Sequence, residues 1–135
     1  MIIAIDFDGT IVEHKYPAIG KARPFAFETL LLLQKKGHQL ILWSYRSGKK
    51  LEEAIAFCAN KGIEFYAVNK SYPEEEFIDN MVSRKIHADL FIDDRNLGGL
   101  PSWGEIYQQI CLAECKLRTP EKHKGFFQFL KKLKI

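Results

Sequence analysis

The sequence predicts an α/β fold, a doubly wound, Rossmann-like and mainly parallel sheet with helices on both faces. Short apolar, β-branched runs alternate with helical patterns along the chain. The runs are apolar on both faces, as in the central strands of parallel sheets. Strands that alternate with helices form right-handed parallel crossovers. The 135 residues have the length of one domain, which we expect to span 1–135 with a core over about 1–115.

Four strands are expected, and each ends where polar residues begin. The first run lies at the N-terminus and becomes polar only at its carboxyl end. The other runs follow helical segments and end in the same way. We expect these strands at residues 1–7, 38–43, 65–68 and 88–92.

Helical signals occupy the gaps between the strands. A proline at a first helical position opens the first helix, a serine N-cap opens the second, and glycines end both. Two serine–glutamate pairs with capping-box spacing open the next two. These signals predict helices at about 24–37 and 47–62, a short one beginning at Ser71, a longer one from Ser102 toward Cys115, and a final basic amphipathic helix at about 119–135.

Composition excludes several classes of protein. A chain that is 47% hydrophobic and 27% charged is neither disordered nor collagen-like. Its apolar stretches are far shorter than the roughly 18 residues needed to cross a bilayer, so we expect no membrane span. The N-terminus lacks the features of a secretory signal, which indicates a cytoplasmic location. The cysteines Cys58, Cys111 and Cys115 form no C-x-x-C pair and indicate neither disulfides nor a zinc site.

The net charge of +3 is unevenly distributed, because residues 116–135 carry seven basic side chains against one glutamate. This basic tail has two interpretations. It is either a closing helix with its lysines in water or a surface for nucleic acid or an anionic membrane. We favour the first.

Polar residues follow all four predicted strands at the same edge of the sheet. The first strand ends at Asp6 and Asp8, the second at Ser44, the third at Asn69 and Lys70, and the fourth at Asp93 and Asp94. Two carboxylates 4 Å apart repel by about 4 kcal/mol at an effective dielectric near 20, so the cluster requires a cation. Oxygen ligands suit Mg²⁺, which shares its coordination with substrate phosphates. A carboxylate that is already ionised is also a nucleophile that needs no activating base.

These residues resemble the motifs of the haloacid dehalogenase (HAD) superfamily of phosphotransferases. The likeness covers residues 1 to about 100, with four motifs in the right order on the right elements. Asp6-Phe7-Asp8-Gly9-Thr10 resembles the first motif, Ser44 the Ser/Thr motif, Lys85 the lysine motif, and Asp93-Asp94 the acidic motif.

The resemblance implies an HAD-like fold with the first strand central and the fourth on the opposite side of it from the second. It implies a Mg²⁺-dependent phosphomonoester hydrolase, a phosphatase that acts through an aspartyl phosphate. By this likeness Asp6 is the nucleophile, Asp8 the general acid and base, and Ser44 and Lys85 bind the phosphoryl group. Asp6, Asp93 and the backbone carbonyl of Asp8 hold the metal, and Asp94 coordinates it directly or through water.

Other cations compete for the phosphate-binding role. Lys49, Lys50 and Lys70 also lie near the active edge, so the choice of Lys85 stays open. Arg46 and Arg95 can either contact phosphate or pair with a carboxylate. Glu13, His14 and Lys15 follow the first motif in a loop, where they can contact substrate or simply be exposed.

The spacing between the motifs leaves no room for a large cap domain. The resemblance therefore implies an open site that accepts a bulky or macromolecular phosphate, or one that a neighbouring subunit covers. Substrate identity and oligomeric state stay open. Two other functions stay open. One is a non-enzymatic, receiver-like phospho-acceptor module, and the other is a nucleic-acid-binding protein that uses the basic tail.

Overall fold

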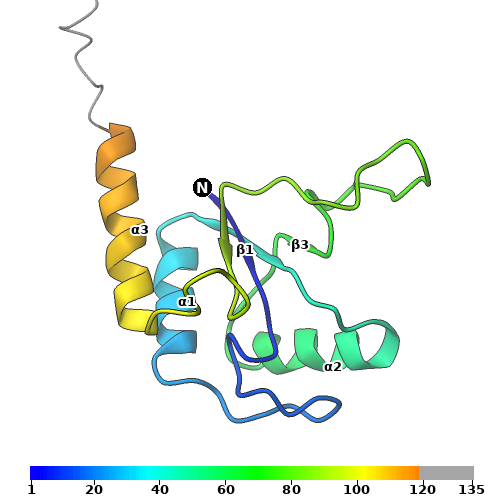
Figure 1. The fold of residues 1–135 in the computed structure, drawn as a ribbon, viewed down its shortest axis with the longest axis horizontal. Helices are drawn as coiled ribbons and strands as arrows, with labels where there is room; N and C mark the ends of the chain where they lie inside the picture. The colour runs from blue at the N-terminus through cyan, green and yellow to red at the C-terminus, as the bar shows by residue number, and fades with distance from the viewer. Residues whose placement is uncertain (119–135) are drawn as a thin grey trace, which may run out of the picture.

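The computed structural model describes residues 1–118, and the helix expected at 119–135 lies outside the described residues. Four parallel strands form one sheet in the order β3-β2-β1-β4, with helices packed beside it (Figure 1). This arrangement confirms the predicted α/β parallel fold and places β1 between β2 and β4. The elements are β1 (Ile2–Ile5), α1 (Ala26–Lys35), β2 (Gln39–Leu42), α2 (Gly48–Ala59), β3 (Ala67–Val68), β4 (Leu90–Ile92) and α3 (Trp103–Arg118).

The main core lies on one face of the sheet. Ile3 and Ile5 of β1 and Leu40 and Leu42 of β2 point into it, together with buried side chains of all three helices. Helices α1 and α3 lie side by side against this face (Figure 1). Each parallel strand is apolar on both sides, as the sequence predicts, because the intervening residues point to the opposite face.

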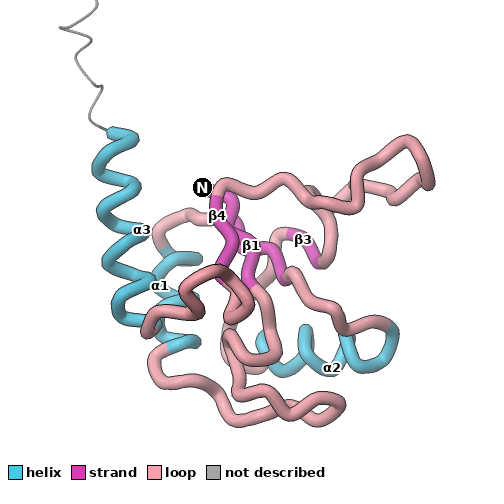
Figure 2. The backbone as a smooth tube through the Cα atoms, viewed as in Figure 1, coloured by secondary structure: helices cyan, strands magenta, loops and turns pink. Residues whose placement is uncertain are grey.

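The second face has a smaller core and differs from the expectation of helices on both faces. Ala4 and Ile41 lie there with Ala67 of β3 and Ile86, which belongs to the irregular connection before β4. Within residues 1–118, no helical side chain belongs to this second cluster. Ala88 of the same connection packs against this cluster, and the connection between β3 and β4 is a long loop (Figure 2).

The short helix expected at Ser71 does not form in this loop, all of which is described. The Ser71 hydroxyl accepts a hydrogen bond from the backbone N–H of His87 (3.0 Å), and the Ser71 N–H donates to the Glu75 carboxylate. The hydroxyl therefore joins the two ends of the loop and does not cap a first turn. Capping-box spacing alone could not reveal this competing partner.

The capping box before α3 is present in full. The Ser102 N–H donates to Glu105 Oε2 (2.9 Å), and the Glu105 N–H donates to Ser102 Oγ (3.3 Å). Ser47 is the N-cap of α2, as predicted, although its side chain makes no capping hydrogen bond. Among the described residues, no helix has the length and hydropathy that a membrane span requires.

Candidate functional site

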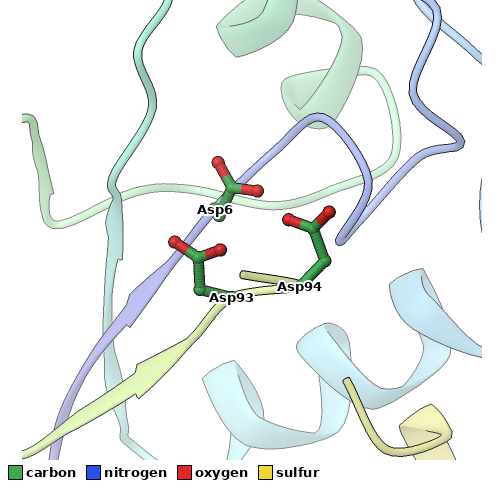
Figure 3. Close-up of side chains that lie close together, drawn as sticks. All are labelled: Asp6, Asp93 and Asp94. Carbon is green, nitrogen blue, oxygen red and sulfur yellow. The ribbon is translucent and has the colours of Figure 1, made fainter. Parts of the chain in front are cut away.

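Three carboxylates meet at the carboxyl ends of β1 and β4. The two strands are parallel neighbours with Ile5 paired to Ile92, so Asp6 emerges beside Asp93 and Asp94. One oxygen from each carboxylate lies within 4.8 Å of the others, and the three side chains converge on a common space (Figure 3). The strand register therefore assembles a set of oxygen ligands of the kind that hard divalent cations prefer.

The turn after β1 holds this acidic cluster in place. The buried Thr10 hydroxyl donates to Asp6 Oδ2 (2.8 Å) and accepts from the Asp94 N–H (3.1 Å). The Thr10 carbonyl accepts from the Trp103 indole N–H (3.0 Å). Thr10 thus joins both acidic strand ends to the start of α3, a role that its place in the first motif did not disclose.

Burial changes the charge state of Asp6. Desolvation raises its pKa from 3.8 to about 7, and the nearby charge of Asp93 contributes in the same direction, whereas the Thr10 hydrogen bond opposes the rise. Without a cation, Asp6 therefore carries a proton for much of the time near neutral pH. A cation held by the cluster would favour the ionised carboxylate.

Asp8 lies outside the acidic cluster, and its carboxylate pairs with Arg46. Arg46 Nε donates to Asp8 Oδ2 (2.6 Å) and Nη2 donates to Asp8 Oδ1 (2.7 Å), a two-pronged ion pair. The Asp8 hydrogen bond raises the pKa of Arg46. Of the two interpretations that the sequence left open for Arg46, the structure shows carboxylate pairing.

Ser44 lies two residues beyond β2, where the sequence analysis places it. Its N–H donates to Asn69 Oδ1 (2.8 Å), and its hydroxyl accepts from the N–H of Arg46 (3.2 Å). Asn69 follows β3 and has a left-handed backbone (φ 53°). The ends of β2 and β3 are thereby tied together beside the site.

A cavity of about 620 Å³ brings most of the predicted residues together. Its volume is well beyond that of a phosphoryl group and leaves space for the group esterified to it. A hairpin formed by residues 13–21, closed by the Glu13 N–H to the Lys21 carbonyl (2.8 Å), contributes two side chains to the wall. The cavity is lined by Asp6, Asp8, His14, Tyr16, Ser44, Tyr45, Arg46, Ser47, Asp93 and Arg95.

The described residues that line the cavity include no lysine. Lys85 is exposed on the segment that leads into β4. Among its rivals, Lys50 pairs with Glu53 (2.9 Å), while Lys49 is exposed and Lys70 is half-buried. The choice among the lysines stays a prediction, and Arg95 is the exposed cation that borders the cavity.

The sequence pattern found the acidic residues and missed their supports. Thr10, Asn69 and Trp103 make hydrogen bonds that depend on the packing of distant segments. The position of Arg46 in the sequence does indicate that it lies near Asp8, because the two residues follow adjacent strands. That position does not indicate whether Arg46 binds a carboxylate or a phosphate.

Comparison with known proteins gives one strong likeness. The chain is similar to a conserved protein from Bacteroides thetaiotaomicron whose structure has been solved, with 56% sequence identity and a TM-score of 0.78. The match covers 89% of this chain and 98% of that protein. No protein-family model and no curated protein matches the chain. The likeness supports the fold and carries no assignment of activity.

Proposed function

This chain belongs to the same family as the conserved protein from Bacteroides thetaiotaomicron, and we propose that it is a Mg²⁺-dependent phosphomonoesterase acting through an aspartyl phosphate. One observation carries the proposal. Asp6, Asp93 and Asp94 converge at the carboxyl ends of adjacent parallel strands, and Asp6 also lines a cavity with Asp8 and Ser44. The arrangement supports the proposal because a nucleophile, an acid and base, and a cation site would lie in one place.

The acidic cluster fits a divalent cation. Three carboxylates within 4.8 Å of one another repel each other when ionised, and burial already disfavours the charge on Asp6. Asp6, Asp93 and Asp94 would hold Mg²⁺, with the backbone carbonyl of Asp8 as a further candidate ligand. When bound, the ion would neutralise charge between the nucleophile and the incoming phosphoryl group.

The first half of the reaction forms the aspartyl phosphate. A carboxylate oxygen of Asp6 attacks phosphorus, and the bond from phosphorus to the ester oxygen breaks. That oxygen takes a proton from Asp8 and leaves as an alcohol. Ser44 lines the same cavity, and its hydroxyl would donate to a phosphoryl oxygen.

The second half regenerates the enzyme. Asp8, now a carboxylate, accepts a proton from water as the water oxygen attacks phosphorus. The bond between phosphorus and Asp6 breaks, which releases inorganic phosphate and restores the Asp6 carboxylate. The proton that Asp8 takes from water replaces the one that it gave to the departing alcohol.

The first test measures phosphate release from p-nitrophenyl phosphate. We expect turnover with Mg²⁺, its loss in EDTA and its return when Mg²⁺ is restored. Asp6→Asn should remove the nucleophile and lower kcat by roughly 10⁴-fold or more while the protein stays folded. The matched control is Asp79→Asn on the exposed loop between β3 and β4, which should retain the wild-type rate. A wild-type rate for Asp6→Asn would refute the proposal.

The lifetime of the acyl phosphate separates an enzyme from a phospho-acceptor module. Rapid release of phosphate after a single turnover supports the enzyme, because Asp8 is available to activate water. A slowly decaying phosphoprotein would instead indicate the signalling role. The cavity volume of about 620 Å³ and the lack of a cap domain among the described residues suit a substrate larger than a simple phosphate.

A further inference from the structure

Arg46 is a buried cation whose hydrogen-bonding capacity is fully used. Its exposed fraction is 2%, and a guanidinium group has five N–H donors. Two are used by the Asp8 carboxylate, at 2.6 and 2.7 Å. The others go to backbone carbonyls of Ala18 (2.8 Å), Pro17 (3.3 Å) and Lys50 (3.5 Å).

No N–H of Arg46 is left for a phosphoryl oxygen. The guanidinium therefore binds groups of the protein and not the substrate. The guanidinium also lies over two aromatic rings, 5.1 Å from the centroid of Phe7 and 5.2 Å from that of Tyr16. These contacts hold its plane in one orientation. A planar fork in a defined orientation in turn determines the orientation of the carboxylate that it binds.

We infer that Arg46 is a positioning residue that orients the Asp8 carboxylate toward the leaving group, an inference that rests on the proposed function. Arg46 also connects the 13–21 hairpin to Asp8. Each Asp8 oxygen accepts one N–H from Arg46, and each retains a lone pair that can carry a proton. Asp8 can therefore transfer a proton while Arg46 holds it. The hydrogen bonds from Arg46 to Pro17 and Ala18 hold the hairpin beside Asp8. The hairpin in turn contributes Tyr16 to the cavity wall.

Arg46→Lys should separate this role from charge alone. Lysine keeps the positive charge but has three donors on one atom and no plane, so it cannot bind both Asp8 oxygens and the two hairpin carbonyls together. We expect kcat to fall with little change in KM, because the phosphate-binding groups are untouched. The fall should match that of a poorly oriented acid, within the range of roughly 10²–10⁴-fold that such groups contribute.

The deciding measurement compares two esters. An alkyl ester such as β-glycerol phosphate needs a proton on its departing oxygen, whereas p-nitrophenyl phosphate releases a stable phenolate and needs it far less. Arg46→Lys should slow the alkyl ester on the order of 10²-fold more than the aryl ester. Asp8→Asn should show the same selectivity. In the double variant, Arg46→Lys should add little to the loss caused by Asp8→Asn, because both changes disable one unit.

Controls make each outcome decisive. Arg84→Lys, on the exposed loop between β3 and β4, should leave both rates unchanged. Arg46→Gln, which retains a planar donor without the charge, is the second variant, and thermal melting checks that each protein is folded. Equal slowing of both esters, a full additional loss in the double variant, or failure of both Arg46 variants to fold would overturn the inference. If the wild-type protein hydrolyses neither ester, it is the proposed function that fails.

Discussion

The acidic cluster depends on the backbone conformation of Gly9 and on its lack of a side chain. Its φ is 84°, in the left-handed region that glycine tolerates best. A Cβ atom built there would lie 2.4 Å from Asp94 Oδ2. The glycine therefore meets two demands, a sharp turn after β1 and space for a carboxylate from β4. The first demand can be read from the sequence, and the second cannot.

Gly9→Ala should therefore do more damage than backbone strain alone. A non-glycine residue in the left-handed region costs about 1–2 kcal/mol, and the added methyl group would also displace the Asp94 carboxylate. We expect a loss of stability in urea unfolding together with a large loss of phosphatase activity and of Mg²⁺ affinity.

Gly37→Ala is the matched control for this prediction. Gly37 has a similar φ of 88°, and no atom lies within 4 Å of the position that a Cβ would take there. The variant should lose about 1–2 kcal/mol and keep its activity. Wild-type activity in Gly9→Ala would show that Asp94 does not need the space.

Residue types in the motif could be predicted, whereas their pairings could not. Asp6, Asp93 and Asp94 come together because strand ends in a parallel sheet share an edge, which is a property of the topology. Asp8 was predicted beside them, yet its carboxylate pairs with Arg46. Arginine is mostly exposed in proteins, so sequence reasoning could not anticipate one that is buried by a hairpin and two aromatic rings.

The start of α3 matters to the site because Trp103 is its first residue. Trp103 is buried and donates its indole N–H to the Thr10 carbonyl (3.0 Å). The reciprocal bonds between Ser102 and Glu105 determine where the helix begins. The hydrogen bonds from Ser102 lower the pKa of Glu105, which keeps a negative charge at the positive end of the helix dipole.

Ser102→Ala should weaken this helix start by about 1 kcal/mol, the usual cost of losing an N-cap side chain. The comparison is Ser47→Ala, because Ser47 is an N-cap whose side chain makes no capping bond. We expect Ser47→Ala to cost only a few tenths of that. Urea unfolding of both variants gives the two values, and equal losses would mean that the Ser102 hydroxyl contributes nothing specific.

The positions of helices and strands could be predicted where they depend on neighbouring residues in the sequence. The strands and the three described helices lie close to their expected positions, since apolar periodicity, glycine stops and caps all depend on residues that are near one another in the sequence. The Ser71 helix was wrong because the Ser71 hydroxyl bonds to His87, 16 residues away. Ile86 and Ala88, from the connection before β4, pack in the second cluster, and no periodic pattern marks such a contribution from a loop.

The molecule as a whole places the Asp6 carboxylate where burial disfavours its negative charge. Asp6 is half-buried beside Asp93 and Asp94, and burial raises its pKa from 3.8 to about 7. Most folded proteins place such a group where it is paired. Here the described residues around Asp6 supply the Thr10 hydroxyl and further carboxylates, so the relief must come from a proton or from a bound cation.

This arrangement predicts how stability varies with pH in EDTA. Between pH values of about 4 and about 7 the folded protein retains a proton on Asp6 that the unfolded chain has released. The free energy of unfolding therefore falls as pH rises through this range and levels off above it. The slope due to Asp6 stays below the one-proton limit of about 1.4 kcal/mol per pH unit, because the side chain is partly solvated. Asp6→Asn has no such proton, so the wild type should lose stability relative to the variant across this range.

Urea unfolding of both proteins from pH 5 to 8.5 measures this difference directly, since the other ionisable groups are common to the two. Adding Mg²⁺ should narrow the gap at pH 8, because a cation stabilises the ionised Asp6 that burial penalises, and the variant binds the ion more weakly. Parallel curves in EDTA would show that Asp6 is an ordinary carboxylate. If Mg²⁺ leaves the stability difference between the two proteins unchanged at pH 8, the cation does not bind beside Asp6. The two readings separate the electrostatics of the fold from the proposed chemistry of the site.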